Sequence, residues 1–469
     1  MNGSLHDTIC AIATPVGEGG IGIVRISGEK AIEVASTFVR LRSGRALAAV
    51  KSHRVQHADV LERDPRRPVD EALVLVMRAP HSYTAEDVVE IQCHGGPFIL
   101  HTICEAAIHA GARLAEPGEF TKRAFLNGRL DLTQAEAVLD TIRAKTSGSL
   151  RLAQEQLRGT LSREIDGIRE MLIGLLAHIE AAIDFTEEDI TFIQPQALLA
   201  GLTNAIAAVT RLTETGEEGR ILREGVMAAI IGRPNVGKSS LLNALLQTDR
   251  AIVTPIPGTT RDVLEEVLNI RGIPVRLVDT AGLRDTDDPV EHEGVRRSRM
   301  AMEQAELLVL VLDGSVPLTA EDRTLLSHHA DKKRLVVVNK TDLPSQIDPS
   351  ELERLVTREP GQPPSRAVWI SVRTETGLDD LRDAIRTMML RADFEPGEAA
   401  VITRLRHRNN LTKAREALAA AVESVQGGLS GEFVAMDLRA AIDALGEITG
   451  AVTTDDILDR IFRDFCIGK

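Results

Sequence analysis

GRPNVGKS, at Gly232–Ser239, is the most informative segment of the sequence. An apolar run at Val226–Ile231 precedes it, and leucines at helical spacing follow it. This order predicts a strand, a glycine-rich turn and a helix whose backbone N–H groups and positive end face a phosphate. Lys238 is placed to reach the β- and γ-phosphates, and the Ser239 hydroxyl is placed to bind Mg²⁺. Alone, the segment indicates only a nucleotide.

Later motifs indicate which nucleotide is bound and where its metal lies. Asp279–Gly282 follows a short apolar strand, and it suits a magnesium-linked carboxylate with a glycine N–H near the γ-phosphate. Asn339–Asp342 follows another strand, and the Asp342 carboxylate can accept from the N1–H and N2–H₂ groups of guanine, a donor pair that adenine lacks. Ser371–Arg373 suits a backbone contact to the guanine oxygen, and Thr260 suits the switch position that binds Mg²⁺.

Together these motifs predict a GTP site. The expected nucleotide-binding residues are Asn235, Val236, Gly237, Lys238, Ser239, Ser240, Thr254, Thr259, Thr260, Asp279, Thr280, Ala281, Gly282, Asn339, Lys340, Asp342, Ser371, Val372 and Arg373.

The position after Gly282 lacks the glutamine with which Ras-type GTPases orient the attacking water. Leu283 stands there, and its side chain can neither donate nor accept a hydrogen bond. Another group must therefore hold the water, and an acidic, solvated loop is the alternative interpretation for most candidates. The candidates are Asp285, Asp287, Asp288, Glu291 and Glu293. The side-chain oxygen of Asn235 can coordinate a monovalent cation in place of an arginine finger.

Composition sets the class of protein. A chain of 469 residues is expected to form about three domains. The net charge of −14 argues against non-specific coating of nucleic acid, although it allows a local basic patch or a partner that contacts RNA. The four cysteines are scattered without a CxxC pair, which predicts neither a disulfide framework nor a zinc site. Without a signal-like N-terminus or an apolar run of about 18 residues, we expect a cytoplasmic protein.

The order of elements predicts three domains, two of them interleaved. Residues 1–124 mix short strands with helices, which indicates an α+β domain. Residues 125–220, with a break at Gly216–Gly219, and residues 390–469 carry apolar residues at three- and four-residue steps, which predicts amphipathic helices. We expect an α/β G domain at 221–389, inserted into one discontinuous helical domain. Two unrelated helical pieces are the alternative, and the alanine-rich seams can also serve a dimer.

Two features of the first domain are less specific. The glycines of Gly17–Gly22 resemble a phosphate loop, but no Lys-Ser/Thr pair follows at the required offset, so we expect a turn. His94, beside Gly95 and Gly96, is a catalytic candidate, with a structural hydrogen-bonding role as the alternative.

The chain also resembles the MnmE (TrmE) family of tRNA-modifying GTPases over essentially its whole length. The resemblance rests on segments outside the nucleotide motifs, and these segments are more specific than the motifs themselves. They are Ala13–Pro15, Gly22–Gly28, Tyr83–Asp87, His94–Gly96, Pro117–Thr121, Arg123–Leu132 and Phe465–Lys469.

The resemblance implies an N-terminal tetrahydrofolate-binding domain that also forms a homodimer, a helical domain and an inserted G domain. The folate, (6S)-5-formyl- or 5,10-methylene-tetrahydrofolate, would contact Arg25, Glu90, Arg129 and Lys469. Arg129 stands where lysine is expected in the family, which keeps the charge but changes its geometry. Cys466 is implied as a participant in the chemistry, with a tail cysteine of no catalytic role as the alternative.

The resemblance further implies how GTP hydrolysis is activated. The G domains would dimerise across their nucleotide faces when K⁺ binds Asn235 and a loop containing Thr254, Ile256 and Thr259. Glu291 matches the family's water-positioning acid, acting through a bridging water. K⁺ and Glu291 would thus replace the arginine finger and the glutamine.

Finally, the resemblance implies a substrate and a partner. With the FAD- and NADH-dependent MnmG (GidA) subunit, in a heterotetramer or larger complex, such a protein adds a carboxymethylaminomethyl group to C5 of the wobble uridine (U34) of certain tRNAs. One alternative is a GTP-dependent switch or ribosome-linked assembly factor with no direct role in tRNA modification. Another is a folate enzyme that GTP merely regulates.

Overall fold

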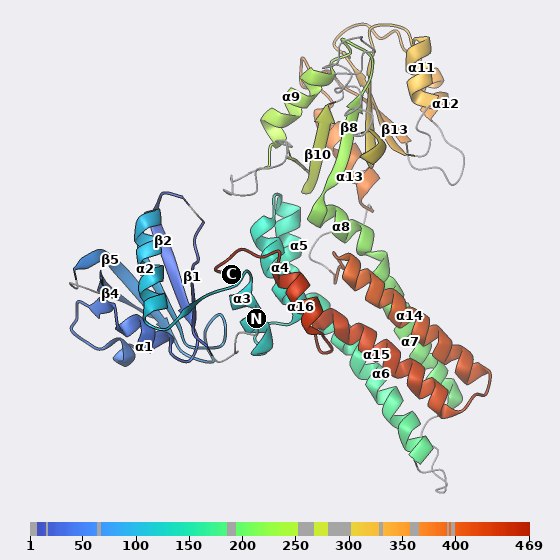
Figure 1. The fold of residues 1–469 in the computed structure, drawn as a ribbon. Helices are drawn as coiled ribbons and strands as arrows, with labels where there is room; N and C mark the ends of the chain where they lie inside the picture. The colour runs from blue at the N-terminus through green and yellow to red at the C-terminus, as the bar shows by residue number, and fades with distance from the viewer. Residues whose placement is uncertain are drawn as a thin grey trace, which may run out of the picture.

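Three bodies make up the structure, a computed structural model (Figure 1). It describes residues 7–15, 17–62, 67–184, 194–251, 267–279, 302–327, 332–356, 365–391, 394 and 399–469. In Figure 1 the N-terminal sheet domain is blue, the second sheet domain runs from green to orange, and cyan-green and red helices lie side by side between and below them. This arrangement confirms the predicted fold class of an α+β, a helical and an α/β part.

A seven-stranded sheet organises the N-terminal domain. Its strands are β1 (Ile9–Ile12), β2 (Gly19–Ser27), β3 (Val39–Leu41), β4 (Arg54–Leu61), β5 (Pro68–Met77), β6 (Val88–Gly95) and β7 (Arg113–Leu114), in the order β3-β4-β5-β6-β2-β1-β7. The accompanying helices are α1 (Ala31–Ser36), the 3₁₀ helix η1 (Leu47–Ala49), α2 (Pro97–His109) and α3 (Glu119–Leu126). Because side chains alternate along a strand, Val24 and Ile91 pack under α2, while Arg25 and its neighbour Glu90 take the opposite face.

That opposite face mixes polar side chains with exposed apolar ones. Val55 on β4 and Leu73 on β5 lie on it by register, and they are 51% and 46% exposed. Ile21, in the irregular part of β2, is 67% exposed. Apolar side chains exposed in this way commonly mark an interaction surface.

The second sheet is a parallel, helix-covered sheet of the kind that binds nucleotides. Its strands are β8 (Val226–Ile231), β9 (Val267–Ile270), β10 (Ile273–Asp279), β11 (Leu307–Asp313), β12 (Lys333–Asn339) and β13 (Ser365–Trp369), in the order β13-β12-β11-β8-β10-β9. Its helices are α9 (Lys238–Asp249), α11 (Ala320–Ser327), α12 (Pro349–Val356) and α13 (Leu378–Met389). All neighbouring strands are parallel except β9 and β10. The carboxyl ends of the parallel strands therefore meet at one edge, where such sheets bind ligands.

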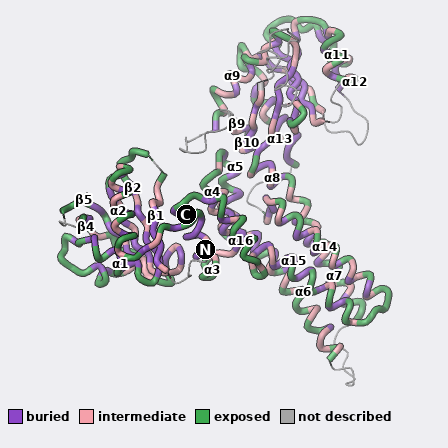
Figure 2. The backbone as a smooth tube through the Cα atoms, in the orientation of Figure 1, coloured by how far each residue is buried: buried purple, intermediate pink, exposed green. Residues whose placement is uncertain are grey.

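Helices from both sides of this sheet domain share one core. They are α4 (Leu132–Arg143), α5 (Ser147–Leu157), α6 (Thr160–Asp184), α7 (Pro195–Glu214), α8 (Gly216–Glu224), α14 (Leu405–Gln426), α15 (Gly431–Thr449) and α16 (Asp455–Phe462). Leu172 and Leu202 pack with Leu418 and Leu438, and all four are fully buried. Figure 2 shows buried and exposed stretches alternating along these helices, as expected for amphipathic helices.

The predicted break at Gly216–Gly219 is confirmed as the end of a helix, since α7 ends at Glu214, but these residues are themselves helical and begin α8. Gly219 has a packing reason to be glycine. A Cβ atom there would lie 2.0 Å from the carbonyl oxygen of Ile402, so the missing side chain lets α8 lie against the returning chain.

A buried carboxylate joins α4 to α14. Glu136 is 2% exposed, accepts a hydrogen bond from Arg406 at 3.1 Å and lies 2.9 Å from Nε2 of the buried His407. Burial alone would raise the pKa of Glu136, but the hydrogen bond from His407 and the charges of Arg406 and Arg404 hold it well below its usual range. Burial lowers the pKa of His407 despite the attraction of Glu136, so this imidazole is neutral near pH 7.

We predict that this pair makes the helical domain sensitive to mild acid. The contribution of His407 to the free energy of unfolding is fully present above about pH 6.5, where the unfolded imidazole loses its proton. It is lost as the pH falls toward the lower pKa of the folded protein, because the unfolded chain then binds more protons. Urea midpoints from helical circular dichroism at pH 7.5, 6.5 and 5.5 measure this.

His407→Gln should flatten the fall in midpoint between pH 7.5 and 5.5. His101→Gln, on the exposed surface of α2, is the matched control and should leave the fall unchanged. Equal pH slopes for wild type and His407→Gln would contradict the assignment.

Candidate functional site

The predicted phosphate loop joins β8 to α9 as expected. Lys238 is the first residue of α9, and its ammonium group donates to the carbonyl oxygens of Gly232 and Arg233, both at 2.8 Å. These contacts hold the charged group over the loop. Ser239 and Asn235 are exposed, so their side-chain oxygens are accessible to a cation bound there.

Asn339 at the end of β12 connects two parts of the site. Its amide nitrogen donates to the carbonyl oxygen of Val236 at 2.9 Å, and its oxygen accepts from the N–H of Val372 at 3.1 Å. Gly237 permits this contact, because it has a left-handed φ of 104° and a Cβ there would lie 2.2 Å from the Asn339 amide. The phosphate loop and the predicted guanine loop are therefore fixed relative to each other by one buried side chain.

The two other members of the guanine motif are also held in place. The Ser371 hydroxyl donates to Asp342 at 2.7 Å, and this hydrogen bond keeps the pKa of the Asp342 carboxyl below its usual value. Lys340 forms an ion pair with Asp313 at the end of β11. Arg373 lies 4.0 Å from Asp342 and is exposed. An ionised acceptor is thus presented at the sheet edge, which is the chemistry that guanine recognition requires.

Part of the predicted site lies outside the described residues. This part comprises Thr254, Ile256, Thr259, Thr260, Thr280, Ala281, Gly282, Leu283 and all the candidate acids, Glu291 included. Asp279 is the last residue of β10, paired in register with Ile230 of β8, which places its backbone beside the phosphate loop.

A second cluster forms in the N-terminal domain around Tyr83, the only tyrosine in the chain. The guanidinium groups of Arg25 and Arg129 lie 5.3 and 5.1 Å from the centre of its ring, within cation–π range. Arg25 donates to Glu90 at 2.8 Å, and Arg129 donates to the Tyr83 carbonyl oxygen at 2.7 Å. The Tyr83 hydroxyl forms a hydrogen bond with the Thr121 hydroxyl at 2.8 Å, and burial raises the pKa of Tyr83.

The C-terminal tail reaches this cluster. Arg25 donates to the carbonyl oxygen of Gly468 at 3.4 Å, and the Gly118 N–H donates to that of Cys466 at the same distance. Burial and the neighbouring Arg25 lower the pKa of Lys469. The structure therefore brings Arg25, Glu90 and Lys469 together, with Arg129 across the Tyr83 ring, as a cationic site with one carboxylate.

Sequence reasoning missed Tyr83 as a site residue. The tyrosine belongs to the segment Tyr83–Asp87, which carries part of the family resemblance, and that was the available signal. His94 is not in this cluster. Its ring nitrogen Nδ1 donates to the Asp70 carboxylate at 2.8 Å on an exposed part of the sheet.

Comparison with known proteins places these features in one family. Residues 8–129 match the family model of the GTP-binding protein TrmE N-terminus, and residues 132–466 match that of the MnmE helical domain. A protein of Heliobacterium modesticaldum named tRNA modification GTPase MnmE is 48% identical over 469 residues, covering 99% of both chains. Proteins with the same name from Geobacter metallireducens (47%) and Alkaliphilus oremlandii (44%) cover 99% of this chain, each over its own full length.

We predict that Asn339→Ala weakens binding of guanine nucleotides about tenfold to a hundredfold. The variant loses two hydrogen bonds worth about 1 kcal/mol each, and the Val236 carbonyl and Val372 N–H lose their partner. Titration with a fluorescent GDP analogue measures the Kd. Asn409→Ala, at an exposed position of α14, is the control. A Kd for Asn339→Ala within twofold of wild type would show that the connection is unimportant.

Proposed function

The chain belongs to the MnmE family of tRNA modification GTPases, and from this premise we propose the reaction it serves. It is a GTP hydrolase. We propose that K⁺ and G-domain dimerisation activate hydrolysis, and that with an FAD-dependent partner the protein adds a carboxymethylaminomethyl group to C5 of the wobble uridine of certain tRNAs. The one-carbon unit comes from a tetrahydrofolate. One observation carries this proposal. The same chain holds a site suited to guanine and a cationic cluster that the C-terminal tail contacts.

The geometry of the nucleotide edge supports the proposed roles. Lys238 binds the β- and γ-phosphates, and its present carbonyl partners show that its side chain already points over the loop. Ser239, exposed at the start of α9, fits Mg²⁺ through its hydroxyl, with Thr260 as the second protein ligand. Asp342 selects guanine, since Ser371 favours its ionised form. Mg²⁺ supplies positive charge to the phosphates, and the chain supplies orientation.

We assign K⁺ binding to the side-chain oxygen of Asn235, together with Thr254, Ile256 and Thr259. Two properties of Asn235 support this role: its exposure on the loop and its left-handed φ of 63°. A cation here would lie next to the phosphates and offset their charge. Glu291 then orients the attacking water, in place of the glutamine that Leu283 replaces.

The cationic cluster has the chemistry of a folate site. A pterin ring presents neighbouring N–H donors that suit the Glu90 carboxylate, and the glutamate end of a folate carries carboxylates that suit Arg25, Arg129 and Lys469. Tyr83 adds an aromatic face that holds both guanidinium groups. Cys466, exposed in the same tail, is the candidate for a chemical role.

The partners complete the proposal. The exposed apolar side chains of Ile21, Val55 and Leu73 support a homodimer formed by the N-terminal domains. The flavin subunit MnmG supplies the redox chemistry, and a net charge of −14 agrees with that subunit providing much of the tRNA contact. Among the described helices, none is both long and apolar enough to cross a membrane.

We predict at least about tenfold faster GTP turnover in KCl than in NaCl, because a cation beside the phosphates takes over the role of an arginine finger. Asn235→Gly should abolish this difference while preserving nucleotide binding. Glycine is the appropriate replacement, since it tolerates the left-handed backbone at this position, whereas alanine would strain it. Phosphate release measures turnover.

Glu291→Ala is the companion variant, and it should bind GTP normally but lose most of its turnover in KCl. Equal, slow rates in both salts for the wild-type protein would remove K⁺ from the proposal, and an unchanged kcat for Glu291→Ala would assign the water to another residue.

We further predict saturable binding of 5-formyl-tetrahydrofolate to the full-length protein. Arg129→Ala should weaken it about tenfold or more, since a charge-assisted hydrogen bond contributes about 1.5–3 kcal/mol. Arg129→Lys should recover part of the affinity, and Arg45→Ala, at an exposed site between β3 and η1, should have no effect. Isothermal titration calorimetry gives the Kd values.

The same measurement separates the proposal from a GTP-dependent assembly factor. Absence of folate binding, together with normal wobble uridines in a strain lacking this protein, would favour the assembly factor.

A further inference from the structure

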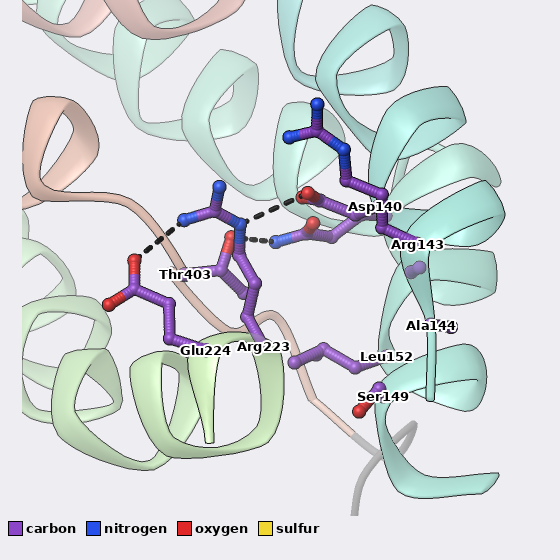
Figure 3. Close-up of a pocket in the computed structure, with 10 residues that line it drawn as sticks. Asp140, Arg143, Ala144, Ser149, Leu152, Arg223, Glu224 and Thr403 are labelled. Atoms are coloured by element: carbon purple, nitrogen blue, oxygen red, sulfur yellow. Dashed lines mark hydrogen bonds and ion pairs between the residues drawn. The ribbon is translucent and has the colours of Figure 1, made fainter. Parts of the chain in front are cut away.

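Both connections of the inserted G domain meet at one carboxylate, Asp140 on α4. The first connection is α8, whose Arg223 donates to Asp140 Oδ1 at 3.0 Å. The second is the returning segment 399–404, whose Arg404 donates to both oxygens of Asp140 at 2.9 Å. The Asp140 side chain is only 10% exposed. Figure 3 shows Asp140 and Arg223 pointing toward each other across the gap between their helices.

The two connections also contact each other, so they are expected to move together. The Ile402 N–H donates to the Thr215 hydroxyl at 3.1 Å, where α8 begins. Gln156 of α5 donates to the Val401 carbonyl oxygen and the Thr403 hydroxyl, both at 3.1 Å. Glu218 in α8 pairs with Arg391, next to the end of α13, at 2.6 Å.

One side of this junction is closely packed, through Gly219 and Ile402, and the other side is held by polar contacts around a small cavity. A cavity of about 90 Å³ lies between α8 and the α4–α5 pair, lined in part by Arg143, Leu152, Arg223 and Thr403 (Figure 3). Close-packed interiors resist displacement, so the side with free space and directional ion pairs is where the geometry of the junction can change. A shift of α8 is therefore expected to act first on Asp140.

The same helix holds the C-terminal tail. Arg143, one turn beyond Asp140 on α4, donates to the carbonyl oxygen of Asp464 at 2.7 Å. From Asp464 the tail runs past the buried Phe465 to Gly468, whose carbonyl oxygen accepts from Arg25 in the cationic cluster. A single turn of α4, from Asp140 to Arg143, therefore separates the connections of the G domain from the C-terminal tail that reaches the cationic cluster.

We propose that Asp140 is a positioning residue that transmits the nucleotide state of the G domain through α4 to the C-terminal tail. Binding of GTP instead of GDP shifts α8, changes how Asp140 is shared between Arg223 and Arg404, and moves the Arg143–Asp464 contact. The inference rests on the proposed function for its purpose, the control of a folate site, but the coupling itself is independent of what that site binds.

The C-terminal tail contains a cysteine, Cys466, whose reactivity reports the position of the tail. Cys466 is exposed, whereas Cys10, Cys93 and Cys104 are buried, so a thiol reagent such as 5,5′-dithiobis-(2-nitrobenzoate) labels Cys466 first. The experiment compares the fast labelling rate of the full-length protein with GDP and with guanylyl imidodiphosphate in KCl. Cys466→Ser identifies the fast phase by removing it. We expect the two rates to differ about fivefold or more, the lower end of typical allosteric couplings.

Asp140→Asn keeps the shape of the side chain but removes its charge, and it should bring the ratio of the two rates close to one. Its Kd for both nucleotides should stay unchanged, which a purely local folding defect in the G domain would not allow. Glu180→Gln, which removes an exposed ion pair with Arg439 between α6 and α15, is the matched control and should keep the wild-type ratio.

Arg143→Gln supplies a second variant on the tail side of α4. It should also bring the ratio close to one, with faster labelling in both nucleotide states. Equal rates with the two nucleotides in the wild-type protein, or a wild-type ratio in both Asp140→Asn and Arg143→Gln, would overturn the inference. A nucleotide-dependent rate in a protein that binds no folate would retain the coupling and refute only the folate assignment.

Discussion

The helical domain depends on the buried charge of Glu136. Its carboxylate pairs with Arg406, which lies 270 positions away in sequence, and with the adjacent His407. Removing one partner of such a buried pair costs about 3–5 kcal/mol, because it leaves an uncompensated charge in the interior. This cost favours a single position of α14 against α4. That position fixes where the intervening G domain begins and ends.

The position of α14 against α4 also determines how the two candidate sites are connected. The nucleotide edge of the second sheet is built entirely within the inserted segment, from the loops after parallel strands. The cationic cluster, in contrast, combines β2, β6 and the C-terminal tail, so it is complete only when the helical domain holds that tail in place. Asp140 and Arg143 lie between the two because α4 contacts the connections of one site and the final segment of the other.

The sequence predicted best what depends on local spacing. The strand Val226–Ile231 and the turn into α9 are as expected, because a phosphate loop requires glycines and lysine at set offsets. Strands β3 and β4 and helix α16 could not be assigned, since tertiary neighbours rather than intrinsic preference determine such elements. The role of Tyr83 was hidden for a similar reason. Nothing in its own segment indicates that Arg25 and Arg129 come to lie against its ring.

The split core has a consequence for biosynthesis. Helices α6 and α7 end at Asp184 and Glu214, but the helices that cover their apolar seam begin only at Leu405. At about 5–20 residues per second, roughly 10–40 s of translation separate the two. During that interval the ribosome-bound chain exposes Leu172, Leu202 and their neighbours to the cell. A chaperone that shields leucine-rich helices, or rapid folding of the G domain that keeps the two halves close, would serve newly made chains of this architecture.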